Sequence, residues 1–344
     1  MKRIVYISLL LMVAFYELKA QQDVHFSQFY SSPLTINPAQ AGLFNGGVRA
    51  MVNYRSQWAA VNNPFTTISG SVDGGLFREK ISNGFFGVGG NVIKDDAGDA
   101  QFSTLNGNLS LSYHFDLSGG EEMSYFSVGF QGGYLQRSIS LGSLYWDQQW
   151  DGSAFNTSLP HNEAYQDLSY SRWIFASGVN WYINSYDNSK QFYIGLSAYN
   201  LNAPNVGFKS TSENYLRRYQ LHSGAEILFP NSTVSVVPNA IYMMQGPNRY
   251  LNLGTDVKFL LSERTAITNY HNESSLHFGV YHRFKDALYA TFMINWVGLS
   301  LGASYDFNIS GLKAVTNSNG GMEIFLRYRS GFGGGKRPHK VRFI

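Results

Sequence analysis

Apolar and polar residues alternate along most of this chain, and this alternation limits the possible folds more than any other feature. In residues 298–309, GLSLGASYDFNI, one face of an extended chain carries Leu, Leu, Ala, Tyr and Phe, and the other carries Ser, Gly, Ser, Asp and Asn. A period of two residues predicts a β-strand with one apolar and one polar face. Residues 101–115 and 215–229 repeat the pattern, with Tyr215 on the apolar face, so we expect an all-β protein.

The same rule predicts about 14 strands, and an even number is typical of transmembrane barrels. Several of them are about 10–12 residues long, which a tilted strand needs to cross a bilayer. Asn, Asp, Gly and Pro, the usual residues of tight turns, separate the segments. The expected strands are 47–59, 65–76, 83–94, 101–115, 123–139, 171–183, 190–199, 215–229, 231–243, 248–260, 274–284, 287–296, 298–308 and 321–330.

Composition favours a membrane barrel over a soluble β-sandwich, whose strands would alternate as well. Only 14% of the residues are charged, against about 25% in typical soluble domains, and 16% are aromatic. After residue 20, no apolar run approaches the roughly 20 residues of a transmembrane helix. The polar faces contain Ser, Asn, Gly and Gln more than Lys and Glu. We therefore expect a transmembrane antiparallel up-and-down β-barrel around a polar lumen.

The two ends of the chain differ from this central part. Residues 1–20 have a basic start, an apolar run and a final Ala20, the layout of a cleaved secretory signal peptide. With no cysteine, the chain has neither a disulfide nor a lipid-bearing Cys, and 26 basic against 23 acidic residues give no electrostatic reason to bind nucleic acid. The expected division is a signal peptide at 1–20, an extended N-terminal plug or periplasmic segment at 21–46, an outer-membrane barrel at 47–330 and a basic periplasmic tail at 331–344.

Residues 25–43, HFSQFYSSPLTINPAQAGL, match no regular element. Pro33 and Pro38 exclude a regular helix or a central strand, yet the Phe, Tyr, Leu and Ile residues are too apolar for a solvated tail. We expect this segment to enter the barrel from the periplasmic side and to fill part of the lumen; docking on a periplasmic partner is the alternative. The polar residues expected to line the lumen are His222, Glu226, Asp256, Lys258, Glu323 and Arg327.

The connections between strands suggest an orientation. If the barrel begins in the periplasm, odd-numbered connections lie outside the cell, where outer-membrane barrels have their long loops. The connections at 141–170 and 200–214 are long and odd-numbered, whereas the one at 261–273 is an exception, because it is also fairly long but would lie in the periplasm. The first contains Tyr145, Trp146 and Trp150, and two interpretations stay open: the aromatic rings pack in the barrel mouth, or they bind a partner.

Four stretches of the chain resemble the PorP/SprF family of outer-membrane proteins, which serve type IX secretion and gliding motility in Bacteroidetes. They are DVHFSQFYSSPLTINPAQAG (23–42), YRSQW (54–58), SYDFNIS (304–310) and GGMEIFLRYR (320–329), and they follow one another along nearly the whole mature chain. The ending KVRF (340–343) lacks the Cys of a similar ending in relatives. The residues that carry the resemblance are His25, Phe26, Phe29, Tyr30, Pro33, Asn37, Pro38 and Gly42 in the leader, and Tyr54, Arg55, Gln57, Trp58, Tyr305 and Asp306 in the barrel.

The resemblance implies a location in the outer membrane of a Gram-negative bacterium and a role as a barrel accessory of the secretion system. The expected partners are outer-membrane lipid, type IX secretion components and a cognate large surface protein, such as an adhesin, whose secretion or attachment the barrel supports. Two alternatives stay open: a core component that contacts the periplasmic ring and peptidoglycan, and a general porin.

No pattern in the chain predicts catalysis or a cofactor. GLSLG (298–302) matches the Gly-x-Ser-x-Gly motif of hydrolases, but Ser300 falls within an alternating strand rather than on a sharp strand-to-helix turn. KDDAGDA (94–100) places Asp95, Asp96 and Asp99 in one turn but lacks the spacing and terminal Glu of a calcium loop. We expect neither an enzyme nor a metal protein.

Overall fold

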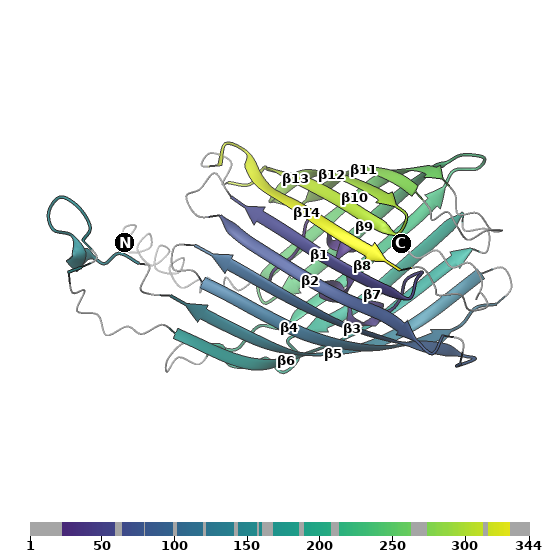
Figure 1. Ribbon diagram of the computed structural model, residues 1–344, viewed down its shortest axis with the longest axis horizontal. Helices are drawn as coiled ribbons and strands as arrows, with labels where there is room; N and C mark the ends of the chain where they lie inside the picture. The colour runs from purple at the N-terminus through teal and green to yellow at the C-terminus, as the bar shows by residue number, and fades with distance from the viewer. Residues whose placement is uncertain are drawn as a thin grey trace, which may run out of the picture.

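A closed barrel of antiparallel strands makes up most of the molecule (Figure 1). In this computed structural model, each strand pairs with its neighbours in the sequence, and the first strand pairs with the last. The strands are β1 (Val48–Gln57), β2 (Phe65–Leu76), β3 (Gly84–Ala97), β4 (Phe102–Asp116), β5 (Glu122–Ile139), β6 (Leu168–Ser185), β7 (Lys190–Tyr199), β8 (Arg218–Leu228), β9 (Val234–Gln245), β10 (Asn248–Ser262), β11 (Ser274–Arg283), β12 (Ala287–Trp296), β13 (Leu299–Asn308) and β14 (Asn319–Arg329). The structure describes residues 23–58, 64–78, 80–98, 102–119, 122–140, 144–156, 158–159, 168–185, 189–207, 213–262, 274–311 and 316–330.

The predicted up-and-down barrel is confirmed, and the soluble β-sandwich is excluded. The pairing of β1 with β14, which closes the barrel, is continuous from Arg49 opposite Arg329 to Gln57 opposite Gly321. The expected strands differ from the observed ones by three residues at most at either end. In a closed ring, every strand forms backbone hydrogen bonds with a neighbour on each side. A sheet that crosses a bilayer needs this, because the hydrocarbon offers its N–H and C=O groups no partners.

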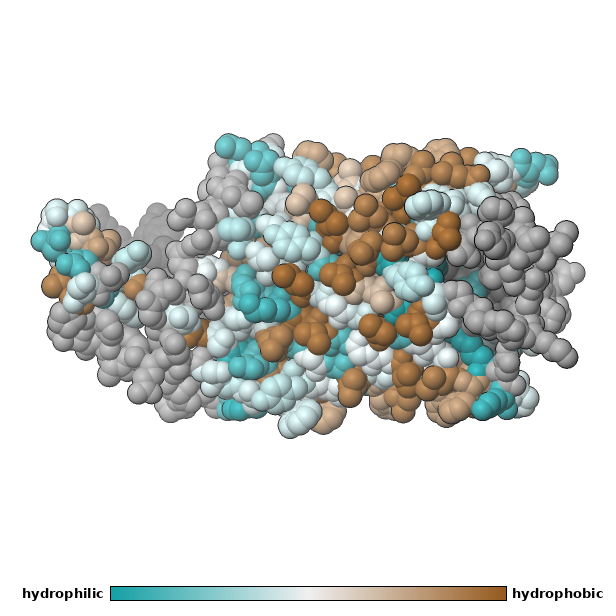
Figure 2. All heavy atoms as spheres, viewed as in Figure 1, coloured by the Kyte–Doolittle hydropathy of each residue, from teal (hydrophilic) through white to brown (hydrophobic). Residues whose placement is uncertain are grey.

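The alternation places apolar side chains outside and polar side chains in the lumen. In β13, Leu301 and Phe307 are each 49% exposed, whereas Ser300 and Asp306 on the other face are 1% and 2% exposed. Figure 2 shows apolar residues gathered over the middle of the barrel wall. An apolar outer belt of this kind is the surface that a lipid bilayer covers.

One expectation about the faces is wrong. Tyr215 was expected on the apolar outer face, but it is only 4% exposed and lies before β8 begins at Arg218. Its hydroxyl donates a hydrogen bond to the carboxylate of Asp23 inside the barrel. The period of two holds only while the backbone is pleated, and the chain is irregular at Tyr215, so the alternation no longer sets the direction of its side chain.

Residues 23–46, called here the N-terminal segment, run through the lumen (Figure 1). They form three short turns, η1 (Phe29–Ser31), α2 (Pro33–Ile36) and η2 (Pro38–Gln40). Pro33 and Pro38 each occupy the first position of a turn, where the missing N–H of proline does no harm. Within the described residues, no helix is long and apolar enough to cross a bilayer.

The two ends of the barrel are distinct. At the terminal end, β1 begins and β14 ends; at the loop end lie the odd-numbered connections, such as β1–β2 and β5–β6. In Figure 1 the terminal end is on the right, and the teal β5–β6 connection projects from the loop end on the left.

Candidate functional site

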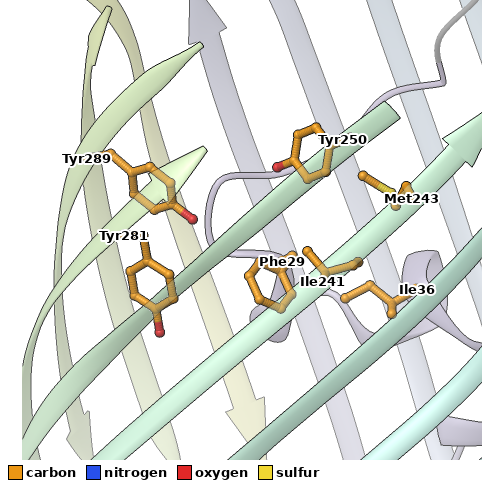
Figure 3. Packing of buried hydrophobic residues seen from close by; sticks show 7 residues of the cluster. All are labelled: Phe29, Ile36, Ile241, Met243, Tyr250, Tyr281 and Tyr289. Atoms are coloured by element: carbon orange, nitrogen blue, oxygen red, sulfur yellow. The ribbon is translucent and has the colours of Figure 1, made fainter. Parts of the chain in front are cut away.

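The N-terminal segment packs against the inner wall through two apolar clusters. Phe29 and Ile36 lie in the first, whose wall residues are Ile241, Met243, Tyr250, Tyr281 and Tyr289 (Figure 3). Leu43 and Phe44 belong to the second, with Phe85, Tyr182 and Tyr193 from the wall. Burying one such side chain stabilises a protein by about 1.5–3 kcal/mol, so the segment is part of the packed interior.

A buried charge network binds the segment near its start. The backbone N–H groups of Ser27 and Gln28 donate to the Glu323 carboxylate, at 2.6 and 3.1 Å. The Ser27 hydroxyl donates to Asp306 at 3.0 Å. Asp306 also accepts from Arg283 at 2.6 Å and from Arg55 at 3.5 Å.

This network joins all four stretches that carry the family resemblance. Arg55 lies in YRSQW, Asp306 in SYDFNIS and Glu323 in GGMEIFLRYR, and Arg55 donates a hydrogen bond to the His25 carbonyl of the leader. One buried polar residue from each of the three barrel stretches therefore takes part in a single site, which binds the N-terminal segment.

His25 lies beside these arginines, and its ring contacts Tyr250 with centroids 4.5 Å apart.

Asn37 anchors the middle of the segment. Its side-chain amide donates to the carbonyls of Val179 and Leu196, at 2.8 and 3.2 Å, and lies 3.1 Å from His222 Nε2. Its Oδ1 accepts from the Ala39 N–H at 2.9 Å and so forms the turn at Pro38. A Cβ at Gly178 would lie 2.1 Å from that oxygen, so the wall needs glycine where Asn37 approaches.

Gly42 brings the chain against the wall near the terminal end. Its N–H donates to Asp73 at 2.7 Å, and Asp73 forms an ion pair with Arg49 at 2.7 Å. Gly42 has a φ of +72°, and a Cβ there would lie 2.7 Å from the Gly74 carbonyl oxygen. Only glycine meets both conditions without strain.

Asp23, the first described residue, lies at the loop end. Its carboxylate pairs with Arg218 at 3.2 Å and accepts from Gln245 at 3.0 Å, where β9 turns into β10. The expected entry from the periplasmic side assumed that the segment enters the lumen at the terminal end, and this is wrong: the chain runs through the lumen from the loop end to the terminal end. The inward Arg and Gln that hold Asp23 come from β8 and β9, so their position relative to the leader was not visible in the sequence.

The other residues expected in the lumen do face it. Glu226 and Lys258 form an ion pair at 2.8 Å, and Asp256 accepts from Thr291 at 2.7 Å and from Tyr281. Arg327 contacts Ser300 and is described further below. None of these pairs touches the charge network around Asp306.

Some family-resemblance residues lie away from the lumen. Tyr54 and Tyr305 are on the outer face, 39% and 41% exposed. Trp58 packs against Phe65 near the loop end, with ring centroids 4.9 Å apart. The family resemblance thus includes residues of the outer surface as well as residues that bind the N-terminal segment.

The aromatic residues of the β5–β6 connection form a small exposed cluster. Trp150 contacts Phe155 at 5.1 Å between ring centroids, and Tyr145 contacts Phe155 at 5.4 Å. Tyr145 is 65% exposed and Trp150 49%, while Trp146 is half-buried beside the short helix η4 (Asp147–Gln149). Figure 1 shows this part of the connection projecting away from the strands. The exposed rings are available to a partner.

The residues of the hydrolase-like motif and of the acidic turn make contacts within the barrel wall. Ser300 faces inward from β13 at the terminal end and accepts a hydrogen bond from Arg327 at 3.1 Å. Asp95 accepts from Thr67 and Asp96 pairs with Lys94, while Asp99 lies outside the described residues. In the described part of the chain, no group of three or more His, Asp or Glu side chains is placed to hold a metal ion.

Several wall residues of this site were not identified from the sequence. Arg283 pairs with Asp306, Asp73 binds Gly42, and the Tyr289 hydroxyl donates to the Ser27 carbonyl at 2.6 Å. The alternation does place all three on the polar or inward side of their strands, but it does not tell which inward residues meet the leader.

Comparisons with known proteins identify one family. A family model described as "Type IX secretion system membrane protein PorP/SprF" matches residues 18–328. Among solved structures, the toluene transporter TbuX of Ralstonia pickettii is 9% identical, with a TM-score of 0.45, over 91% of this chain and 96% of that chain. A FadL homologue of Pseudomonas aeruginosa is 10% identical, with a TM-score of 0.43, over 85% and 92%. No match was found among curated proteins.

Proposed function

This chain belongs to the PorP/SprF family of type IX secretion system membrane proteins, and we propose that it acts as a closed outer-membrane receptor for a secreted surface protein. Its place in the outer membrane and its association with type IX secretion follow from the family. The observation that carries the proposal is the filled lumen. A barrel whose interior is packed with its own chain offers a binding surface rather than an open passage.

The N-terminal segment is proposed to close the lumen permanently. It contacts the wall along its whole length, through Asp23 at the loop end, Ser27 close to that end, Asn37 in the middle and Gly42 near the terminal end. Its apolar side chains are buried between these polar anchors. These contacts argue against the general porin, which requires a continuous aqueous path.

The loop end is proposed to face the cell exterior. It carries the β5–β6 connection, and outer-membrane barrels have short periplasmic turns and longer external loops. The exposed rings of Tyr145, Trp150 and Phe155 then point away from the membrane. Exposed aromatic side chains of this kind are typical anchors of protein interfaces, so we propose that the surface protein binds to this cluster.

Affinity purification tests the proposal. The full chain, tagged at its C-terminus, is solubilised from outer membranes, and the proteins that copurify are identified by mass spectrometry. We expect a large secreted surface protein. The double variant Tyr145→Ser, Trp150→Ser should reduce its recovery at least about 10-fold, because loss of one aromatic anchor costs about 2 kcal/mol or more.

Trp296→Ser is the matched control, since Trp296 is 66% exposed but lies where β12 turns into β13 at the terminal end. Its recovery of the surface protein should equal that of the natural chain. Recovery of periplasmic ring components alone would contradict the receptor and favour the core-component alternative.

A further inference from the structure

Five buried arginines line the described lumen, and one of them differs from the rest. Four are paired with carboxylates: Arg49 with Asp73 at 2.7 Å, Arg218 with Asp23 at 3.2 Å, and both Arg55 and Arg283 with Asp306, at 3.5 and 2.6 Å. The fifth, Arg327, is 7% exposed and has no carboxylate within ion-pair distance among the described residues.

The contacts of Arg327 are all with neutral groups. Its Nη2 and Nε lie 3.1 and 3.3 Å from the Ser300 hydroxyl. Nη2 also lies 3.4 Å from Asn295 Oδ1 and 3.7 Å from Met293 Sδ. A buried charge that meets only neutral partners is unfavourable, because their hydrogen bonds do not supply the opposite charge that would offset the loss of its hydration.

Other positive charges lie close to Arg327 at the terminal end. Arg49 and Arg329 face each other across β1 and β14, one inward position beyond Arg327. Like charges on facing positions of a sheet repel each other. Asp73, the acid of the nearby strand β2, is already engaged in its ion pair with Arg49.

Hydrogen-bonding groups surround the guanidinium as well. The Asn295 amide lies 2.9 Å from the Ser275 hydroxyl and 3.0 Å from His277 Nε2. The Ser300 hydroxyl accepts from Arg327, so its own proton remains to be donated. Arg327 and Ser300 together present donors of the kind that bind oxyanions.

We propose that Arg327 is the centre of an anion-binding site at the terminal end of the lumen, which takes a carboxylate or phosphate group. The planar guanidinium binds two oxygens of such a group side by side, and the anion supplies the charge that the wall lacks. The site itself is independent of the receptor function. The proposed orientation decides only the side from which the anion reaches the site, which would be the periplasm.

Thermal unfolding of the purified full chain in detergent tests the site. Citrate and inorganic phosphate are compared with chloride at equal ionic strength. One or both should raise the unfolding temperature, by about 2 °C when the anion exceeds its Kd about fivefold. A response to citrate alone identifies a carboxylate group, and a response to phosphate alone a phosphate group.

Arg327→Gln should abolish the response, and Lys190→Gln, which removes an exposed cation at the same end of the barrel, should retain it. Ser300→Asp provides a second test if Arg327→Gln does not fold. It supplies a carboxylate where the Ser300 hydroxyl now touches Arg327, so it should unfold at a higher temperature in chloride and no longer respond to either anion. The proposal is overturned if neither anion shifts the natural chain, or if Ser300→Asp responds as the natural chain does.

Discussion

At the scale of single residues, Asp306 links the wall to the N-terminal segment through more charged groups than any other residue described above. It accepts hydrogen bonds from the Ser27 hydroxyl and from the guanidinium groups of Arg55 and Arg283. All of these groups are buried. Removing the carboxylate charge would take from Arg55 its ion-pair partner among the described residues and would leave Arg283 with Asp286 alone.

The variant Asp306→Asn should therefore lower the free energy of unfolding by about 3–5 kcal/mol, as expected when one member of a buried ion pair is lost. Urea unfolding of the barrel in lipid vesicles, followed by Trp fluorescence, measures this change. Asp96→Asn is the control. Asp96 and its partner Lys94 are 40% and 55% exposed, so this change should cost less than about 1 kcal/mol. Equal effects of the two variants would contradict the role given to the buried network.

At the scale of elements, the N-terminal segment behaves as an internal layer of the barrel rather than as a strand or a tail. Its short turns depend on Pro33, Pro38 and Asn37, and its apolar side chains take the place of water in the lumen. The wall is adapted to it by glycine at the points of closest approach, as at Gly178.

Deleting residues 22–44 should open the lumen. We expect the conductance of single barrels in planar bilayers to be small for the full chain and clearly larger for the deletion variant, because polar wall residues would then surround water. Resistance of the folded barrel to heat in detergent, seen as a mobility shift on gels, controls for folding. If the folded deletion variant conducts no better than the full chain, the segment does not close the lumen.

At the scale of the whole molecule, the structure makes the two ends of the barrel unequal. The exposed aromatic cluster and Asp23 lie at the loop end. Arg327, the start of β1 and the end of β14 lie at the terminal end. A receptor for a surface protein requires the loop end to face outward, so the orientation in the membrane tests the proposal as a whole.

The sequence has no cysteine, so a single introduced thiol can report the orientation. Ser153→Cys, in the β5–β6 connection, should react with a membrane-impermeant maleimide on intact cells. Ser82→Cys, between β2 and β3 at the terminal end, should react only after the outer membrane is permeabilised. Both serines are exposed, so access to the reagent is the difference between the two variants. The reverse labelling pattern would place the aromatic cluster in the periplasm.

The alternation of residues was enough to predict the barrel, the strands and the outward or inward face of most side chains. This succeeds because the period of two is a local property of an extended chain, and because lipid outside and polar groups inside impose the same choice on every strand. Pro33 and Pro38 likewise excluded a regular helix or strand for the leader. Where the backbone leaves the pleat, as at Tyr215, the rule no longer applies.

Which residues meet in the lumen was decided only by the tertiary structure. Ser27 reaches Asp306 and Glu323 across almost the whole length of the chain, and their contact depends on ring closure between β1 and β14. The direction of the leader, and the lack of a carboxylate partner for Arg327 among the described residues, likewise depend on how the strands close into a ring. Alternation states that a side chain points inward, but the position of its partner across the lumen follows from strand number, register and tilt, which no single segment encodes.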